Sequence, residues 1–154
     1  MTAVYLAAPY AARDLVRNFA ADLDGMLVEV TSSWLKEDHE ITAGTLGAAK
    51  DLSDDQVAKH ARDDLKDIGD SDLLVLITES IAGVPGTTGG RHVETGFALG
   101  FGLPVLVVGP AENVFHRLGE SEGVYLAKDW PDALSRIATL ETGAPLAEAF
   151  GAKR

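Results

Sequence analysis

Five short apolar runs, separated by segments with helical periodicity, constrain the fold of this chain more than any other feature. The runs have the length of β-strands and cover residues 3–8, 27–31, 73–78, 104–108 and 124–127. The third and fourth runs are almost wholly apolar, which is typical of parallel strands that are covered on both faces. They predict a largely parallel sheet at the centre of the molecule.

The segments between the runs carry helix signals. Residues 13–23 place apolar side chains on one face of a helix. Ser53 and Gln56 have the spacing of a capping box, and Pro131, two residues after Asp129, marks another helix start. The predicted helices cover residues 13–23, 53–68, 91–101, 113–118 and 131–140.

The alternation of strands and helices predicts an α/β fold, with a doubly wound sheet of about five mostly parallel strands and helices on both faces, of the Rossmann or flavodoxin-like type. The length suffices for a single domain, residues 1–154. We expect residues 42–52 to form a flexible insert, and the residues after about 142 to form a tail or a docked helix. Ligands in such folds bind beyond the carboxyl ends of the strands, so we expect the site in the segments that follow them.

Composition and charge exclude several classes of function. The formal net charge of −11 disfavours binding to a nucleic-acid backbone, although backbone amides can still bind a small anion locally. The absence of cysteine excludes disulfides and thiolate chemistry. The N-terminus lacks the basic region of a signal peptide, and no apolar run approaches the ~20 residues that span a bilayer. We therefore expect a cytoplasmic protein without membrane or nucleic-acid partners. Its four histidines lack the spacing of metal ligands, so we expect no metal, and we expect no cofactor.

The most informative segment for function is GTTGGRHVETGFALG, residues 86–100. Its glycines allow the backbone to approach a ligand, and the amides at the helix start can bind a phosphate. Glu94 falls in the first two turns of that helix, where the helix dipole favours an ionised carboxylate that can act as nucleophile or base. The alternative is that Glu94 is a capping residue of an ordinary helix.

Two further segments bring candidate polar groups to the sheet. Asp64 belongs to an acidic stretch, residues 63–72, that runs directly into the third strand. Most such stretches are solvated helix faces, but one carboxylate can project at the strand ends. Tyr5 lies in the first strand, where a tyrosine is usually a core residue, yet its hydroxyl can hydrogen-bond a carboxylate and fix its direction. Both residues therefore have a structural and a functional interpretation.

Taken in order, these segments resemble the nucleoside 2-deoxyribosyltransferase superfamily, which includes deoxyribosyltransferases and 2′-deoxynucleoside 5′-phosphate N-hydrolases. The resemblance covers residues 3–118. The matching motifs are VYLAAPY, the run Asp64-Leu65-x-x-Ile68-x-x-Ser71-Asp72, the pattern G-G-x-x-x-E-x-G-x-A from Gly89 to Ala98, and the strand PVLVVG. The order and spacing of the motifs make the resemblance more specific than any one of them does.

The resemblance implies a reaction and three catalytic residues. The glutamate at the position of Glu94 attacks C1′ and displaces the base, an aspartate matching Asp64 handles the proton at the base, and a tyrosine matching Tyr5 orients the nucleophile. This chemistry is consistent with the three residue types. A nucleobase leaves poorly as an anion and therefore needs an acid, and a covalent glycosyl-enzyme divides one difficult step into two easier ones. The implied partner is a small-molecule nucleoside or nucleotide.

The position six residues before the nucleophile distinguishes two substrate classes in this superfamily. The transferases that act on free nucleosides resemble one another in carrying an aspartate there, whereas the monophosphate hydrolases carry a small hydroxyl side chain; this chain has Thr88. A threonine hydroxyl beside glycine amides favours a phosphate, which an aspartate would repel. We therefore expect a 5′-monophosphate substrate. The first loop, residues 8–12, departs from the hydrolases because it lacks their glycines and arginine.

Several other residues are candidates for contacts with the substrate or with a neighbouring subunit. Trp34 follows the second strand and either stacks on the base or belongs to the core or surface. Asn113 resembles a position that family members lend to the site of the neighbouring subunit, which implies a homodimer. The other candidates for binding the substrate are Ala8, Pro9, Arg13, Gly89, Gly90 and Arg91, of which the two arginines are the expected phosphate partners.

The sequence leaves three functions open. The first is cleavage of the N-glycosidic bond of a (2′-deoxy)nucleoside 5′-monophosphate, which gives a free base and a sugar phosphate. The second is base exchange between deoxynucleosides by a 2-deoxyribosyltransferase, and the third is a non-catalytic nucleotide-binding sensor with the same fold. The presence of Glu94, Asp64 and Tyr5 together favours an enzyme, because a pure binding protein has no need of all three.

Overall fold

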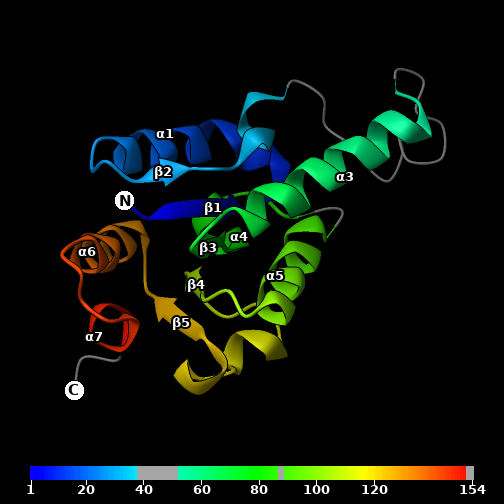
Figure 1. The fold of residues 1–154 in the computed structure, drawn as a ribbon. Coiled ribbons are helices and arrows are strands. Elements are labelled where there is room, and N and C mark those ends of the chain that lie inside the picture. The colour runs from blue at the N-terminus through cyan, green and yellow to red at the C-terminus, as the bar shows by residue number, and fades with distance from the viewer. Residues whose placement is uncertain (38–51, 87–88, 152–154) are drawn as a thin grey trace.

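The computed structural model describes residues 1–37, 52–86 and 89–151 (Figure 1). In this part of the chain, five parallel strands form one sheet in the order β2-β1-β3-β4-β5. The strands are β1 (Ala3–Ala7), β2 (Glu29–Val30), β3 (Leu73–Ile77), β4 (Val105–Val108) and β5 (Val124–Ala127). The sheet confirms the α/β fold that the sequence predicts.

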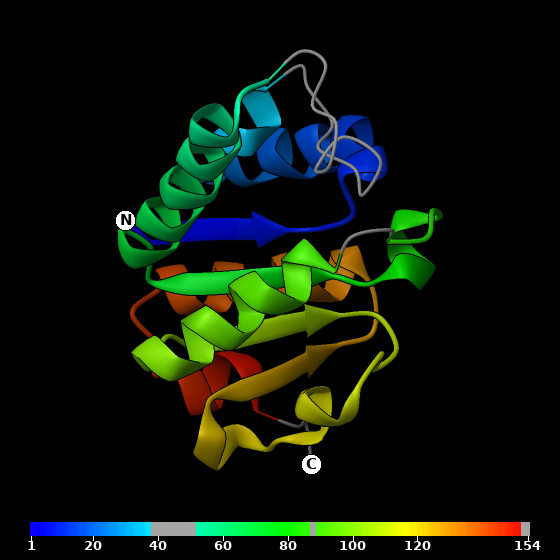
Figure 2. The same cartoon turned by 90° about the vertical axis from the view of Figure 1, so that its right-hand side faces the viewer.

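Helices cover both faces of the sheet, as the doubly wound arrangement requires (Figures 1 and 2). The long helices are α1 (Arg13–Asp24), α3 (Asp54–Gly69), α5 (Gly90–Phe101) and α6 (Trp130–Glu141). α1 and α6 lie on one face, where Phe19 stacks on Trp130 with ring centroids 4.1 Å apart. α3 and α5 pack against each other on the opposite face. Two helix layers therefore enclose the apolar strands.

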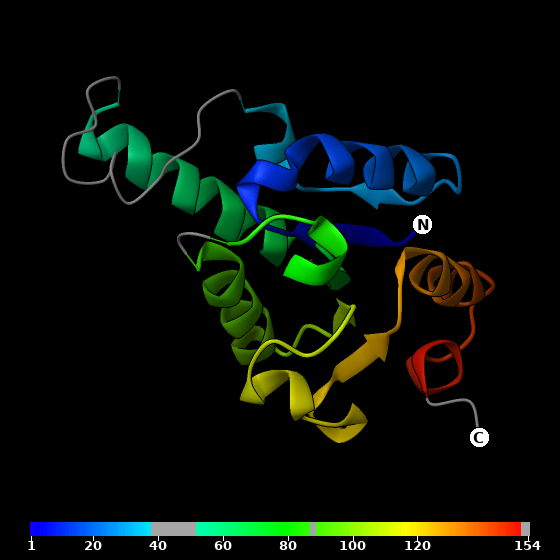
Figure 3. The ribbon, with the colours of Figure 1, turned by 180° about the vertical axis from the view of Figure 1, so that it is seen from behind.

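The short elements complete the described chain. They are α4 (Glu79–Ala82), α7 (Leu146–Phe150) and the 3-10 helices η1 (Tyr10–Ala12), η2 (Ser33–Lys36), η3 (Val114–Arg117) and η4 (Glu120–Glu122). α7 lies beside α6 and β5 (Figure 3), and Phe150 is buried against Tyr125 with ring centroids 5.4 Å apart. Within the described residues, the segment after residue 142 therefore contains a docked helix.

Strand β2 is shorter than the run of residues 27–31 predicts. Leu27 has a positive φ of 62°, which turns the chain just before the strand. Beyond it, side chains replace the backbone ladder along β1, because Leu6 N–H donates to Ser32 Oγ at 2.6 Å and Trp34 Nε1–H donates to the Leu6 carbonyl at 2.8 Å. The open edge of β1 is thereby satisfied without a longer strand.

The helix starts agree with the local signals in the sequence. Ser53 caps α3 in a capping box with Gln56, and Asp129 Oδ1 accepts the Asp132 N–H at 2.9 Å at the start of α6. α5 begins differently, since its N-cap residue Gly89 has a φ of 70°, in the left-handed region where a side chain is strained. The glycine therefore allows the loop to turn directly into α5.

The carboxyl ends of β1 and β3 define the place where a ligand is expected. The two strands are hydrogen-bonded neighbours, and every residue of both is buried. α1 follows β1 on one face of the sheet, whereas α5 follows β3 on the other (Figure 2). The chain thus reverses its winding between these strands, which is the usual ligand-binding position in a sheet of this order.

Two other expectations from the sequence concern the segment 42–52 and the membrane. The expected flexible insert, residues 42–52, lies outside the described residues except for Leu52. Within the described ranges, no helix has the length and apolar character needed to cross a membrane.

Candidate active site

Tyr5 and Glu94 meet at the junction of the sheet and α5. Tyr5 lies at the middle of β1 with its side chain fully buried, and Glu94 lies on the second turn of α5. The Tyr5 hydroxyl donates a hydrogen bond to Glu94 Oε1 at 3.1 Å. Burial, and then the negative charges of Glu94 and Asp64, raise the pKa of Tyr5, so the phenol stays protonated and can only donate to a carboxylate. This contact fixes one carboxylate oxygen of Glu94.

Asp64 is the third member of the group and comes from α3. Because α3 packs against α5 on the same face of the sheet, Asp64 stands near both Glu94 and Tyr5. The charge of Glu94 raises the pKa of Asp64, and the charges of both carboxylates raise the pKa of Tyr5. The Asp64 side chain is partly buried, and its Oδ1 has no hydrogen-bond partner among the described residues. A buried carboxylate oxygen without a partner favours the protonated acid.

The two carboxyl groups have pKa values near neutrality. Burial raises the pKa of Glu94 to about 7, and the hydrogen bond from Tyr5 opposes that rise. Burial also raises the pKa of Asp64 to about 7, with further contributions from the charges of Glu94, Glu37 and Asp67. The Tyr5 hydroxyl lowers the pKa of both carboxyl groups, whereas the negative charges of Glu94, Glu37 and Asp67 raise the pKa of Asp64. The two groups titrate as a pair, and these charges favour the proton on Asp64 and the negative charge on Glu94.

The segment after β1 is tied to the end of η2. Arg13 Nη1 donates to Tyr10 Oη at 2.6 Å and to the backbone carbonyl of Glu37, while Tyr10 Oη donates to the same carbonyl at 3.1 Å. The Glu37 carboxylate contacts His60 Nδ1 of α3 at 2.8 Å. Ala8 leads from β1 into this arrangement. These contacts place Glu37 close enough to Asp64 for its charge to act there.

Sequence reasoning missed Glu37 and His60. Neither belongs to a motif, and they lie 23 residues apart, so no local spacing signals their contact. The structure brings them together because η2 packs against α3.

Trp34 and Arg91 lie in surroundings that differ from their suggested roles. Trp34 is buried, and its indole N–H is used by the Leu6 carbonyl, so the structure favours its interpretation as a core residue. Arg91 was expected to bind phosphate, yet its guanidinium is buried and paired with Glu79 and Glu112. The geometry does not support direct phosphate binding by Arg91, because two carboxylates already neutralise it.

The start of α5 contains the glycines that the sequence assigns to phosphate binding. Gly89 and Gly90 form its N-cap and first residue, and among the described residues no side chain caps this turn. Thr88 lies outside the described residues, and Pro9 is the N-cap of η1. The amide end of α5 therefore faces the same edge of the sheet as the carboxylates, as the fold predicts.

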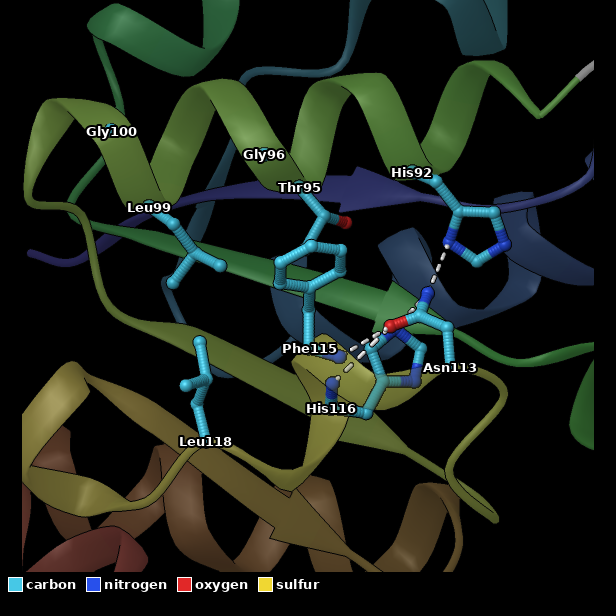
Figure 4. A pocket seen from close by; sticks show the side chains of 9 residues that line it. All are labelled: His92, Thr95, Gly96, Leu99, Gly100, Asn113, Phe115, His116 and Leu118. Carbon is cyan, nitrogen blue, oxygen red and sulfur yellow. Dashed lines mark hydrogen bonds between the residues drawn. The ribbon is translucent and has the colours of Figure 1, made fainter.

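Asn113 belongs to a cavity on a different face of α5 from Glu94. The cavity has a volume of about 570 Å³ and lies between α5 and η3 (Figure 4). Its lining residues are His92, Thr95, Gly96, Leu99, Gly100, Asn113, Phe115, His116 and Leu118. Asn113 Oδ1 accepts the Phe115 N–H at 2.9 Å, and its Nδ2 stands 3.2 Å from His92 Nδ1. Within one chain, Asn113 therefore lies apart from the Tyr5, Asp64 and Glu94 group.

Comparisons with known proteins agree with this architecture. No protein-family model matches the chain, and no curated protein matches its sequence. Its structure is similar to the 2-deoxyribosyltransferase of Bacillus psychrosaccharolyticus, with a TM-score of 0.57 and 18% sequence identity over 86% of this chain and 90% of that chain. It is also similar to the CMP N-glycosidase BcmB of Clostridium botulinum, with a TM-score of 0.55 and 19% identity over 89% of this chain and 98% of that chain. The chain shares the fold of both enzymes.

Proposed function

We propose that this chain is an enzyme that cleaves the N-glycosidic bond of a (2′-deoxy)nucleoside 5′-monophosphate, with Glu94 as the nucleophile. The observation that carries the proposal is the hydrogen bond from buried Tyr5 to Glu94 beside the carboxyl group of Asp64, whose pKa is raised to about 7, at the position where such sheets bind ligands. The fold shared with a 2-deoxyribosyltransferase and a CMP N-glycosidase supports it.

The proposed reaction has two displacements at the anomeric carbon. In the first, a Glu94 carboxylate oxygen bonds to C1′ while the bond from C1′ to the base breaks, and Asp64 gives its proton to the departing base. In the second, the Asp64 carboxylate takes a proton from water, the oxygen of that water attacks C1′, and Glu94 leaves. The products are a free base and a sugar phosphate, and the configuration at C1′ is retained through two inversions.

The 5′-group of the substrate is assigned from Thr88 and the amides at the start of α5. A hydroxyl and several amides can bind a phosphate without a cation from the protein.

One observation favours a second candidate, a 2-deoxyribosyltransferase that acts on free nucleosides. Glu79 and Glu112 add two negative charges near the start of α5 against the single positive charge of Arg91, and such a balance suits an uncharged 5′-hydroxyl.

A panel of nucleosides and their 5′-monophosphates, incubated with and without a free acceptor base and separated by chromatography, tests the proposal. We expect base release from monophosphates without an acceptor. Exchange that requires the acceptor would assign the chain to the transferases instead. Tight binding by calorimetry with no turnover on any substrate would identify the non-catalytic sensor and reject the enzyme.

Thr88→Asp is expected to lower kcat/KM for the monophosphate more than for the matching nucleoside. The physical reason is repulsion between the new carboxylate and the phosphate, which is on the order of tenfold to a hundredfold if they come within hydrogen-bond distance. Steady-state kinetics with both substrates measures this ratio. Thr88→Ser keeps the hydroxyl and serves as the control. Equal losses on the two substrates would remove the assignment of Thr88 to the phosphate.

Tyr5→Phe is expected to move the acidic limb of the pH profile of kcat/KM to higher pH. The hydrogen bond from Tyr5 lowers the pKa of Glu94, so without it the pKa rises further and Glu94 is ionised only at higher pH. A hydrogen bond to a charged group corresponds to a shift of about 1 pH unit. Tyr125→Phe, at a buried position on β5, is the control. An unchanged or lowered acidic limb in Tyr5→Phe contradicts this role.

We also propose that two copies of the chain associate through α5 and η3. Val93, Phe101 and Phe115 expose 70%, 64% and 61% of their surface on these elements, and Phe97 stacks on Phe101 with ring centroids 6.0 Å apart. An exposed apolar patch of this kind usually marks a protein interface. In such a dimer Asn113 would lie near the neighbouring site. Sedimentation velocity checks the proposal, and a monomer at all concentrations would contradict it.

A further inference from the structure

A second polar cluster, distinct from the Tyr5, Asp64 and Glu94 group, lies where β3 and β4 end. At its centre is Arg91, the second residue of α5, whose side chain is 5% exposed. Arg91 Nη2 donates to Glu79 Oε1 at 2.9 Å and to Glu112 Oε2 at 3.2 Å. Glu79 opens α4 directly after β3, and Glu112 follows β4 along the chain. One guanidinium therefore joins α5 to the segments after two strands.

Gly86, before the start of α5, is attached to the same cluster. Glu79 Oε1 also accepts the Gly86 N–H at 2.8 Å, and the Glu79 N–H donates to Glu112 Oε1. Gly86 lies against the guanidinium so closely that a Cβ there would stand 1.8 Å from Arg91 Nη1. A side chain at residue 86 would therefore displace the Arg91 guanidinium from its present position. We call Glu79, Gly86, Arg91 and Glu112 the Arg91 cluster.

The Arg91 cluster carries more negative than positive charge. The backbone N–H of Gly86, and to a lesser extent Arg91, lower the pKa of Glu79, so this carboxylate stays ionised. One guanidinium therefore faces two carboxylates. It offers no net positive charge to a phosphate, and its shielded position leaves little surface for a ligand to contact.

The position of Arg91 connects the cluster to the nucleophile. Arg91 precedes Glu94 by three residues, which is about one helical turn, and its carbonyl accepts a hydrogen bond from Thr95 Oγ1 at 2.7 Å. The direction of the first turn of α5 sets where the Glu94 side chain leaves the helix. A displacement of the reacting group by about 1 Å can lower a rate roughly a hundredfold.

We infer that Arg91 is a positioning residue, which holds Gly86 and the first turn of α5 in place, and so the direction of Glu94, without contacting the substrate phosphate. This inference rests on the proposed function for its kinetic consequence, though not for the cluster itself. It assigns no contact with the 5′-group to the Arg91 guanidinium. The two interpretations of Arg91 predict opposite behaviour when its carboxylate partner is removed.

The kinetic experiment compares Arg91→Gln and Glu79→Ala on a monophosphate and on the matching nucleoside. If Arg91 positions Glu94, both variants lower kcat on both substrates, by roughly tenfold to a hundredfold, with an unchanged ratio of KM values. Arg91→Lys keeps the charge and should recover part of the loss. If Arg91 binds the phosphate, Arg91→Gln raises KM for the monophosphate alone, and Glu79→Ala, which frees the cation, lowers it. That second pattern overturns the inference.

A double-mutant cycle tests the cluster without any turnover. Gly86→Ala is expected to lower the Tm in the native background and to cost much less in the Arg91→Gln background, because the atom that its Cβ would strike is gone. A Gly86→Ala chain that folds only together with Arg91→Gln counts as the same coupling. Gly69→Ala, whose Cβ would meet nothing within 4 Å, is the control and should be additive with Arg91→Gln.

Failure of the inference about Arg91 and failure of the proposed function would give different results. Additive effects of Gly86→Ala and Arg91→Gln would overturn the Arg91 cluster whatever the enzyme does. Absence of base release by the native chain would reject the proposed function and leave the measured coupling in place.

Discussion

Glu94→Gln is expected to lower kcat for base release by roughly 10⁴-fold or more, as expected when a covalent nucleophile is removed. Glutamine has nearly the same shape, and its amide oxygen can accept the hydrogen bond that Tyr5 donates to Glu94 Oε1. The fold should therefore persist, and thermal unfolding should give a Tm close to that of the native chain. The variant loses the negatively charged carboxylate oxygen that forms the bond to C1′.

A covalent intermediate on Glu94 is the more specific expectation. Rapid acid quenching during turnover, followed by peptide mass spectrometry, should locate the added sugar phosphate on the peptide that contains residue 94. The control variant is Glu148→Gln, at an exposed position on α7. Turnover by Glu94→Gln near the native rate, or an adduct on a different carboxylate, would remove Glu94 as the nucleophile.

The fold was predictable because each central strand carries its own signal. In β1, β3 and β4 every residue is buried, so the apolar runs reflect burial on both faces and require no knowledge of the rest of the chain. β2 was predicted too long, since Leu27 has a positive φ before the strand starts and the end of the strand depends on side chains of Ser32 and Trp34 that bond to Leu6, 26 and 28 residues away. Contacts of that kind leave no periodic pattern.

The candidate site was predictable only in part. Tyr5 and Glu94 lie 89 residues apart, and the order of the motifs, not the pattern within either segment, suggested that they meet. The surroundings of Arg91 were not predictable, because its carboxylate partners Glu79 and Glu112 lie 12 and 21 residues away in segments without a motif. In a sequence, an arginine beside glycines favours an anion-binding interpretation, because its ion-pair partners are known only from the structure.

The second large effect, that of replacing Asp64, is judged against the pH profile expected for the native chain. The proposed mechanism requires an ionised Glu94, so we expect activity to fall as the pH drops through the pKa of Glu94, which burial raises to about 7. It also requires a protonated Asp64, so we expect activity to fall as the pH rises through the pKa of Asp64, which burial and the charge of Glu94 raise to about 7. The two carboxyls titrate as a pair, and a narrow bell around neutral pH is expected for kcat/KM.

Asp64→Asn is expected to lower kcat by roughly 10²-fold to 10⁴-fold for ordinary nucleobases, the range for loss of a general acid. An amide cannot give a proton to the base, so the loss should be greatest for bases that leave poorly. It should be smallest for a synthetic substrate whose base leaves readily as an anion. The alkaline limb of the pH profile should disappear as well, because asparagine does not titrate, while the acidic limb due to Glu94 remains.

The neighbouring residue provides the matched control for this variant. Asp63→Asn makes the same substitution one position earlier on α3, where the carboxylate pairs with Lys59 at a solvent-accessible position. It should leave both the rate and the pH profile unchanged, since an exposed pair of this kind contributes little. If Asp64→Asn slows all bases equally and keeps the alkaline limb, the proton comes from another group. Glu37, whose charge acts on Asp64 and whose carboxylate contacts His60, is then the next residue to test.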